Sequence, residues 1–516
     1  MNHLLIAPVV LPALVAPFII MVVRHHLDLQ RIFSVASTVL LAAISLTLAA
    51  QAADGTVQVY ELGDWPAPFG IVLVLDRLAG MMIVLTSFLA LPVLLYAIGS
   101  GWDTRGSNFH ALFQFQLMGI LGAFLTGDAF NLFVFFEVLL IASYGLMIHS
   151  GGPRRFTAGV QYVVYNLLGS TLFLFALGTI YAVTGTLNMA DLAVKVAELP
   201  PGGTALLRTG AAMLLLVFAI KAALLPLHFW LPAAYANAPM PVAALFAIMT
   251  KVGAYAILRV FTLVFGPGTA ATQGLTESWL LPAALLTLAA GAIGIIGARH
   301  IGRLMAFGVI TSMGTLLTAV SLFTEASTAA ALYYLVHSTL AAALLFLVAD
   351  LVIERQGSLI EAQSPMPQAA LIAALFFTGA IAMAGMPPLS GFLGKLLVLD
   401  ATREAAQAPW IWGVVLTGSL VTIVGMARAG SQLFWKAHAI PAMEPAQLEP
   451  LAPDLMQVHR MPAPRRLPFA ACFTLLAGLV ALTVFAGPAT RYAEATAAQL
   501  YAPAAYIETV LGETEQ

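Results

Sequence analysis

The sequence predicts an all-α protein that crosses a membrane many times. Of its 516 residues, 61% are hydrophobic and 9% are charged, and the apolar residues gather in long runs. Soluble domains carry roughly 25% charged residues, so this chain could not cover its surface in water. Many of the runs reach the length of about 20 residues that a helix needs to cross a bilayer.

Gly, Pro and charged residues divide the apolar runs into fourteen candidate spans. The first run is too long for a signal-peptide core and lacks a basic segment before it, so we expect a retained helix. The turn "TGD" at 126–128 and the segment "RHIGR" at 299–303 leave almost no loop between neighbouring spans. The predicted limits, in chain order, are 3–23, 32–50, 71–98, 109–126, 128–148, 160–183, 206–231, 239–264, 278–298, 301–323, 328–352, 368–402, 409–432 and 467–487.

The basic residues support this division, because cytoplasmic loops of membrane proteins collect Lys and Arg. Of the 22 Lys and Arg residues, three lie deep inside spans, and alternation of the rest puts thirteen on one side and six on the other. We therefore expect both termini on the non-cytoplasmic side and a Pro-rich cytoplasmic loop at 433–466. The six exceptions are Arg77, Lys195, Arg208, Arg259, Arg403 and Arg491.

Charge and cysteine content exclude several kinds of partner. The net charge is −2 and no basic stripe is present, so nothing indicates binding to nucleic acid. Cys472 is the only cysteine, which excludes an internal disulfide and a cysteine-cluster metal site.

Among the carboxylates, Asp76, Asp128, Asp350 and Asp400 fall near predicted helix ends, where we expect water to reach them.

Four charged side chains lie deep inside predicted spans: Glu137, Lys221, Lys251 and Lys395. Each costs at least about 2.5–3.5 kcal/mol on insertion scales. Lys221 and Lys251 lie about ten residues, or about 15 Å, from either helix end, which is too far for their amines to reach the headgroups. Lys395 is nearer an end, so snorkelling stays open for it. A static ion pair with Glu137 would explain only one of the three lysines.

Three buried lysines with one carboxylate favour proton transfer. Burial favours the neutral amine, whereas a nearby carboxylate favours the ammonium, so lysines placed in this way can exchange protons near neutral pH. Tyr255 lies one helical turn after Lys251, on a stripe that continues to Arg259. These positions predict a proton relay with a carboxylate as its switch.

Two histidines extend the predicted relay. His337 lies near mid-span with Tyr333 one turn before it, and His228 would share a face with Lys221 if the helix continued past Pro226. Histidine titrates near neutral pH, which suits a relay member. The alternative for each is a hydrogen-bonded core histidine.

Two predicted spans contain proline breaks next to these lysines. "LLPLHFWLP" holds Pro226 after Lys221, and "GMPPLSGFLG" holds Pro387 and Pro388 before Lys395. Proline removes a helical hydrogen bond, and in lipid the freed carbonyls need protein or water partners, so broken helices line cavities. Paired breaks in spans 7 and 12 indicate two inverted five-helix repeats with the ion site at mid-membrane.

The predicted organisation follows from these repeats. We expect three N-terminal helices, a first repeat of helices 4–8, a second repeat of helices 9–13, a cytoplasmic loop, and a last helix with a tail. The corresponding ranges are 1–108, 109–264, 278–432, 433–466 and 467–516.

At these residues the sequence resembles the antiporter-like membrane subunits shared by respiratory complex I and the Mrp-type multisubunit Na⁺/H⁺ antiporters. The motifs are "FFEVLLIASYGLM", "KAALLPLHFWLPAAYANAPMPVAALF", "HSTLAAALLF" and "PPLSGFLGKLLVL", and the resemblance covers nearly the whole chain. Within this family, "TGDAFNLFVFFEVLLIASYGL" is most similar to the D-type subunit of the Mrp antiporters.

The resemblance implies roles for individual residues. Glu137 would pair with Lys221, Lys251 and His337 would continue a hydrated central axis, and Lys395 would end it. It also implies a non-enzymatic transporter subunit of a bacterial inner membrane, with no cofactor and no metal. Its partners would be subunits of the Mrp A, B, C, E, F and G types, and its ions protons with Na⁺ or K⁺.

Two alternatives stay open. Lys395 argues against the M-type subunit of complex I, which carries a glutamate there, and the short tail argues against the L type. The N type, or a membrane hydrogenase subunit, would use the same relay as a non-redox proton pump in a redox complex. The second alternative is a scaffold that moves no ions.

A sodium site needs several oxygen ligands, and Glu137 is the only deep carboxylate, so we expect protons to pass here and the cation elsewhere.

Overall fold

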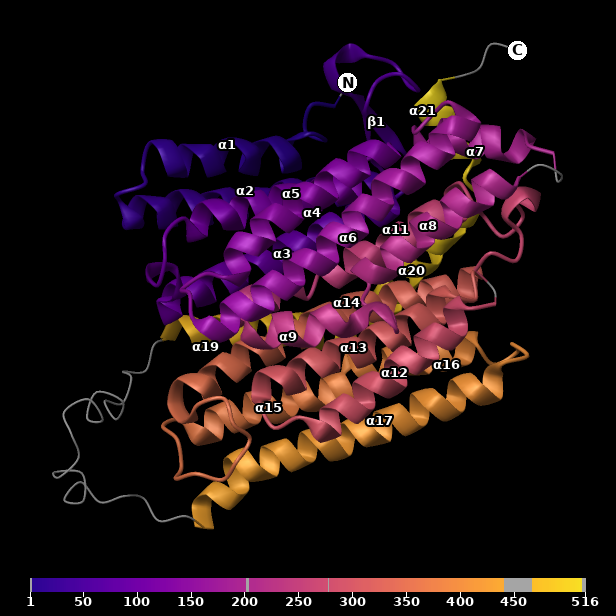
Figure 1. The fold of residues 1–516 in the computed structure, drawn as a ribbon. Helices are drawn as coiled ribbons and strands as arrows, with labels where there is room; N and C mark the ends of the chain where they lie inside the picture. The colour runs from indigo at the N-terminus through magenta and orange to yellow at the C-terminus, as the bar shows by residue number, and fades with distance from the viewer. Residues whose placement is uncertain (1, 201–203, 277, 440–465, 513–516) are drawn as a thin grey trace.

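The computed structural model describes residues 2–200, 204–276, 278–439 and 466–512, which form a bundle of long, roughly parallel helices (Figure 1). Within this part of the chain, ten helices are long and apolar enough to cross a membrane. Three further apolar helices are shorter: α1 (Ala7–Met21), α4 (Phe109–Leu125) and α15 (Ala369–Ala384). The all-α polytopic prediction is therefore confirmed, while the total of fourteen spans stays a prediction.

The third predicted span begins too early. Val72–Leu75 form strand β2, which pairs antiparallel with β1 (Gln58–Glu61). The helix α3 (Arg77–Ser100) starts after Asp76, whose side chain accepts a hydrogen bond from the Ala79 backbone N–H. A carboxylate at this capping position satisfies an otherwise unpaired N–H and marks the helix start. The preceding helix is α2 (Leu27–Ala52).

The first half of the bundle is built around one broken helix. The predicted span 206–231 is divided into a long helix, a short 3-10 turn and a short helix, and the next span is divided at Ala247–Ile248. A surface helix that the sequence analysis did not predict, α7, follows α6 and begins at the capping residue Asn188. The helices are α5 (Ala129–Met147), α6 (Pro153–Thr184), α7 (Met189–Glu198), α8 (Ala205–Lys221), α9 (Trp230–Asn237), α10 (Met240–Phe246) and α11 (Met249–Leu263).

The second half contains the other broken helix. The predicted span 368–402 is divided into α15 and α16, with the proline-containing turn between them. The long helix α14 lies near the centre of the bundle and packs against α10 of the first half and α16 of the second (Figure 1). The remaining bounds are α12 (Leu280–Gly297), α13 (Ile301–Val320), α14 (Glu325–Gln356), α16 (Ser390–Ala401) and α17 (Ala408–Gly430).

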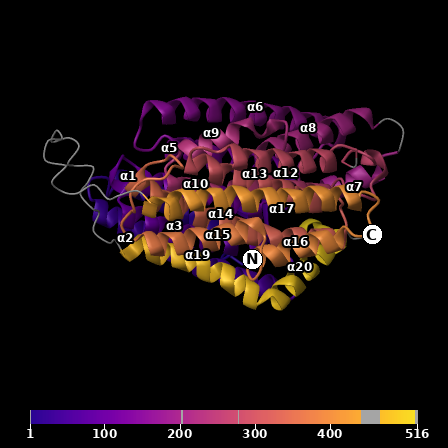
Figure 2. The ribbon, with the colours of Figure 1, turned by 90° about the horizontal axis from the view of Figure 1, so that it is seen from below.

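The C-terminal segment runs along one face of the bundle (Figure 2). It consists of α19 (Arg466–Val484), α20 (Ala486–Tyr501) and α21 (Ala504–Leu511), and α20 packs against α14. The predicted loop 433–466 begins as short helical turns that extend to Ala439. The rest of that loop, 440–465, lies outside the described residues.

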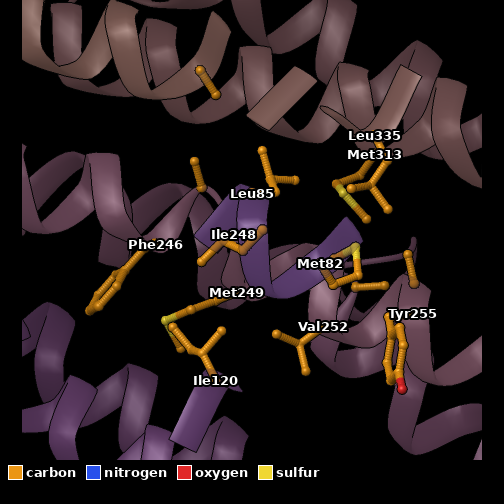
Figure 3. Close-up of a cluster of buried hydrophobic side chains, with 14 of the residues drawn as sticks. Met82, Leu85, Ile120, Phe246, Ile248, Met249, Val252, Tyr255, Met313 and Leu335 are labelled. Carbon is orange, nitrogen blue, oxygen red and sulfur yellow. The ribbon is translucent and has the colours of Figure 1, made fainter. Parts of the chain in front are cut away.

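The hydrophobic core includes all of α10 and α11, whose residues are all buried. Figure 3 shows Ile248, Met249 and Val252 packed among side chains from other helices. Those neighbours are Met82 and Leu85 of α3, Ile120 of α4, Met313 of α13 and Leu335 of α14. Lipid is as apolar as these side chains, so close packing rather than exclusion from water holds membrane helices together.

Candidate functional site

The first helix break begins at Lys221, the last residue of α8. The backbone groups freed by the break find partners in the protein: the Trp230 indole donates to the Ile220 carbonyl at 3.0 Å. The Leu225 N–H donates to the Thr287 hydroxyl of α12 at 2.8 Å. The break is therefore held from both halves of the bundle, and the Lys221 side chain reaches α6.

Glu137 and Lys221 do not form a direct ion pair in the described part of the chain. The Lys221 Nζ donates to the Asn166 Oδ1 at 3.2 Å, and Glu137 accepts a hydrogen bond from the Ser170 hydroxyl. Both α6 residues are buried, whereas Glu137 is partly exposed at the side of the bundle. The charges of Glu137 and Lys221 still interact, so the pairing implied by the resemblance is indirect here.

Lys251 lies in α11 with no exposed surface, and its amine has no hydrogen-bond partner among the described residues. The helix α11 approaches the first break closely at Gly253. A Cβ atom on Gly253 would lie 2.6 Å from the Ala222 nitrogen and 2.9 Å from the Lys221 carbonyl carbon. The absence of a side chain at Gly253 therefore brings the Lys221 and Lys251 segments into backbone contact.

Tyr255 and Arg259 continue the α11 stripe toward the helix end, as predicted from their spacing. The Tyr255 hydroxyl donates to the Phe124 carbonyl at 2.8 Å and accepts from the Arg259 Nε at 3.3 Å. Arg259 in turn makes two hydrogen bonds to Asp76. Tyr255 is thus held between the α4 backbone and a buried ion pair.

The second break brings His337 and Lys395 together. The His337 Nδ1 and the Ser390 hydroxyl, at the first residue of α16, are 2.9 Å apart. His337 interacts electrostatically with both Lys395 and Lys251. The Lys395 amine donates to the Ala384 carbonyl and to the Ser419 hydroxyl, each at 2.8 Å. Ala384 ends α15, so Lys395 satisfies a carbonyl that the break has freed.

Two predicted auxiliary residues lie differently from the expectation. Tyr333 donates to the Leu482 carbonyl of α19 at 3.0 Å, so its hydroxyl points away from His337. The ring next to His337 is that of Tyr334, at 5.7 Å between centroids. His228 lies in a 3-10 turn after the break, so it is not on the Lys221 face, and its Nδ1 has no partner among the described residues.

Three carboxylates expected within reach of water are buried. Asp76 pairs with Arg259, Asp128 caps α5, and Asp350 accepts from the Trp102 indole at 2.9 Å and the Tyr96 hydroxyl at 3.0 Å. Burial raises the pKa of Asp128, which lies outside the helices, to about 6. Asp350 borders a cavity of about 440 Å³ near the loops that follow α5 and α14.

The site contains no evident metal centre in the part of the chain that the structure describes, where no three His, Cys, Asp or Glu residues cluster. The donors are amines, one imidazole, one carboxylate and neutral hydroxyl or amide groups. Such groups pass or hold protons, and they are poor ligands as a set for a transition metal.

Two broken helices, three buried lysines, a buried histidine and a partly exposed glutamate lie within a multi-pass membrane protein. Residues 126–423 match the family model described as NADH:quinone oxidoreductase/Mrp antiporter, TM, and this chain belongs to that family.

Relatives and a solved structure match over nearly the whole chain. The D subunit of a probable K(+)/H(+) antiporter from Rhizobium meliloti is 40% identical, over 99% of this chain and 98% of that protein. The D subunit of a Na(+)/H(+) antiporter from Alkalihalophilus pseudofirmus is 37% identical, over 99% of this chain and 100% of that protein. A chain of the Mrp complex from Dietzia sp. superimposes with a TM-score of 0.86 at 28% identity, covering 99% of this chain and 100% of that chain.

Proposed function

We propose that this chain is the proton-conducting subunit of a multisubunit monovalent cation/proton antiporter. Two relatives named as antiporter D subunits match it from end to end, which supports the D-type assignment over the complex I type. The setting is a bacterial inner membrane, with both termini on the non-cytoplasmic side. The segments 109–264 and 278–432 form the two inverted repeats.

One observation carries the proposal: Lys251 has a fully buried amine with no partner among the described residues. An unpaired ammonium in an apolar interior costs several kcal/mol, and a static structural role offers no return for that cost. A lysine that carries a proton avoids most of this cost, because its amine is charged only while the proton passes. Lys251 is therefore the central proton carrier of the path.

The path follows the contacts of the two breaks. A proton reaches Lys221, on which the charge of Glu137 acts. It passes to Lys251 across the close approach at Gly253. His337, which interacts with Lys251 and Lys395, relays it to the second break. Helix breaks let backbone and water approach these side chains at mid-membrane.

Other subunits complete the transporter. The relatives' names and the Mrp complex neighbour support partners of the Mrp A, B, C, E, F and G types. Glu137 is partly exposed on the side of the bundle at mid-span, where contact with lipid is costly for a carboxylate. A neighbouring subunit covers this position in the complex. The exchanged Na⁺ or K⁺ crosses outside the lysine path, because the path offers one carboxylate.

The test is cation-dependent dissipation of a pH gradient in vesicles that contain the full complex. Glu137→Gln, Lys221→Met and Lys251→Met are expected to abolish the exchange while the complex still assembles. Lys195→Met is the matched control, because Lys195 lies on the surface helix α7 with its side chain 41% exposed. Normal exchange in all three site variants would overturn the proposal.

The second candidate is a proton-pumping subunit of a redox complex. The family description covers both kinds of assembly, and the same relay serves either. Mass spectrometry of the purified complex separates them: other antiporter subunits support the proposal, and quinone-reducing subunits support the second candidate.

A further inference from the structure

The helix α6 places two neutral polar side chains between the charges of the first relay pair. Asn166 contacts Lys221 of α8, and Ser170 contacts Glu137 of α5. The two residues are four apart, so they lie on one face of α6, one turn from each other. Both are buried, at 1% and 4% exposure.

The orientation of the Asn166 amide follows from its contacts. Its Nδ2 donates to the Tyr162 carbonyl at 2.8 Å. A backbone carbonyl can only accept, so the NH₂ group must face it and the Oδ1 must face the Lys221 amine. Asn166 is therefore a fixed acceptor for Lys221. Ser170 also lies 3.0 Å from the Asn166 carbonyl oxygen, so both side chains are anchored to their own helix.

Polar residues on membrane helices often serve only to hold helices together. That role does not explain why each of these two side chains meets a different member of one charged pair. A direct contact between carboxylate and ammonium in a low-dielectric interior is much stronger than in water, so it would hold the proton on the lysine. A neutral spacer weakens that attraction without removing it.

We propose that Asn166 and Ser170 are positioning residues that keep Glu137 and Lys221 apart and so set how readily Lys221 releases its proton. This inference rests on the proposed function and adds a part to it. The two α6 side chains hold the carboxylate and the ammonium by separate hydrogen bonds. The carboxylate then acts on the amine through space, and the amine stays able to pass its proton toward Lys251.

Other titratable side chains lie on the helices that carry this pair. Tyr144 of α5 interacts with Glu137, and the Tyr162 hydroxyl of α6 forms a hydrogen bond with the Ser143 hydroxyl. The turn after the break carries His228, and α11 carries Lys251. Of these groups, Glu137 is the one whose charge interacts with Lys221. Asn166 and Ser170 therefore lie on the side of Lys221 that faces the carboxylate whose charge acts on it.

The experiment is the pH profile of cation-dependent proton exchange in vesicles with the full complex. Asn166→Asp puts a carboxylate where the amide oxygen accepts from Lys221, so the profile midpoint moves up by about one to three pH units, the usual effect of an adjacent opposite charge. Asn166→Ala removes the spacer, so Glu137 can approach the amine directly and the midpoint also moves up; loss of a mere hydrogen-bond acceptor would instead move it down. Gln273→Glu, which adds a charge on an exposed loop, leaves the midpoint unchanged.

An upward shift in Asn166→Ala, as in Asn166→Asp, supports the inference. An unchanged or lowered midpoint in Asn166→Ala overturns it, even where the maximal rate falls. If Asn166→Ala fails to assemble, Ser170→Ala, which frees Glu137 from its contact on α6, decides by the same direction of shift. The proposed function is judged separately, by the loss of exchange in Lys221→Met and Lys251→Met, so the two can fail independently.

Discussion

The Arg259 guanidinium donates two hydrogen bonds to the Asp76 carboxylate, at 2.6 Å and 2.8 Å, with both side chains almost completely buried. The pair joins the last helix of the first half to the N-terminal helices, because Arg259 lies in α11 and Asp76 caps α3. Tyr255 and Tyr506 each present a ring to the same guanidinium. The C-terminal end of the α11 stripe is thus fixed in place beside the proposed relay.

Removing one partner of this pair is expected to destabilise the protein by about 3–5 kcal/mol, because the other charge is left buried and unpaired. Arg259→Met and Asp76→Asn should each lower the unfolding temperature of the purified complex strongly. The double variant should lose less than the sum of the two, because it leaves no unpaired charge. Additive losses would show that the two side chains act independently.

Gly253→Ala is expected to damage transport and stability together. The added methyl group would meet the Ala222 nitrogen at 2.6 Å, so α11 must move away from the first break. Overpacking of this kind costs about 1–3 kcal/mol, and the shift separates Lys221 from Lys251. Gly178→Ala in α6 is the matched control, since nothing lies within 4 Å of its Cβ position. Wild-type exchange in Gly253→Ala would contradict a role for the close approach.

Thr287→Val should weaken the link between the first break and the second half. The variant keeps the side-chain shape and removes the hydroxyl that accepts from the Leu225 N–H. A buried N–H left without a partner costs about 1–3 kcal/mol. Thr171→Val is the control, because the Thr171 hydroxyl is exposed and bonds within its own helix. Thermal unfolding measures both, and equal unfolding temperatures would show that the link contributes nothing.

The stability of the protein should depend on pH through Asp103, which lies in the loop between α3 and α4. Burial alone would raise the pKa of Asp103, but hydrogen bonds from His110 and Arg31 outweigh it and lower the pKa below its usual range. With the folded-state pKa below the unfolded value of about 3.9, the contact stabilises the fold above that pH and is lost as pH falls through the folded-state value. The gap in unfolding temperature between wild type and Asp103→Asn is therefore wide at pH 7 and narrows below about pH 4. A constant gap would contradict this.

Most of the helices could be predicted from the sequence, because a membrane imposes long apolar runs with sharp polar ends. The limits of α4, α5 and α12 differ from the predicted spans by a residue or two. The start of the third span was wrong because "VLVL" is apolar in a strand as well as in a helix. Apolar composition alone does not distinguish the two over four residues.

The buried charges were also visible in the sequence, because a charge in an apolar run is rare and costly. Their neutral neighbours were not. Asn166 and Ser170 are ordinary polar residues in a membrane helix, and only the rotation of α6 toward α5 and α8 gives them a role. Tyr333 and Tyr334 show the same limit, because spacing along one helix did not reveal that α19 bonds to Tyr333.

The two breaks differ in which side chain donates a hydrogen bond to the backbone carbonyl freed at the break. At the first break, the Trp230 indole donates a hydrogen bond to the Ile220 carbonyl. This carbonyl therefore keeps its partner when Lys221 moves or changes charge. At the second, the Lys395 amine itself occupies the Ala384 carbonyl. Moving that amine away would leave the Ala384 carbonyl, at the end of α15, without this donor. Movement of the second lysine therefore has a cost in backbone hydrogen bonding that movement of the first does not have.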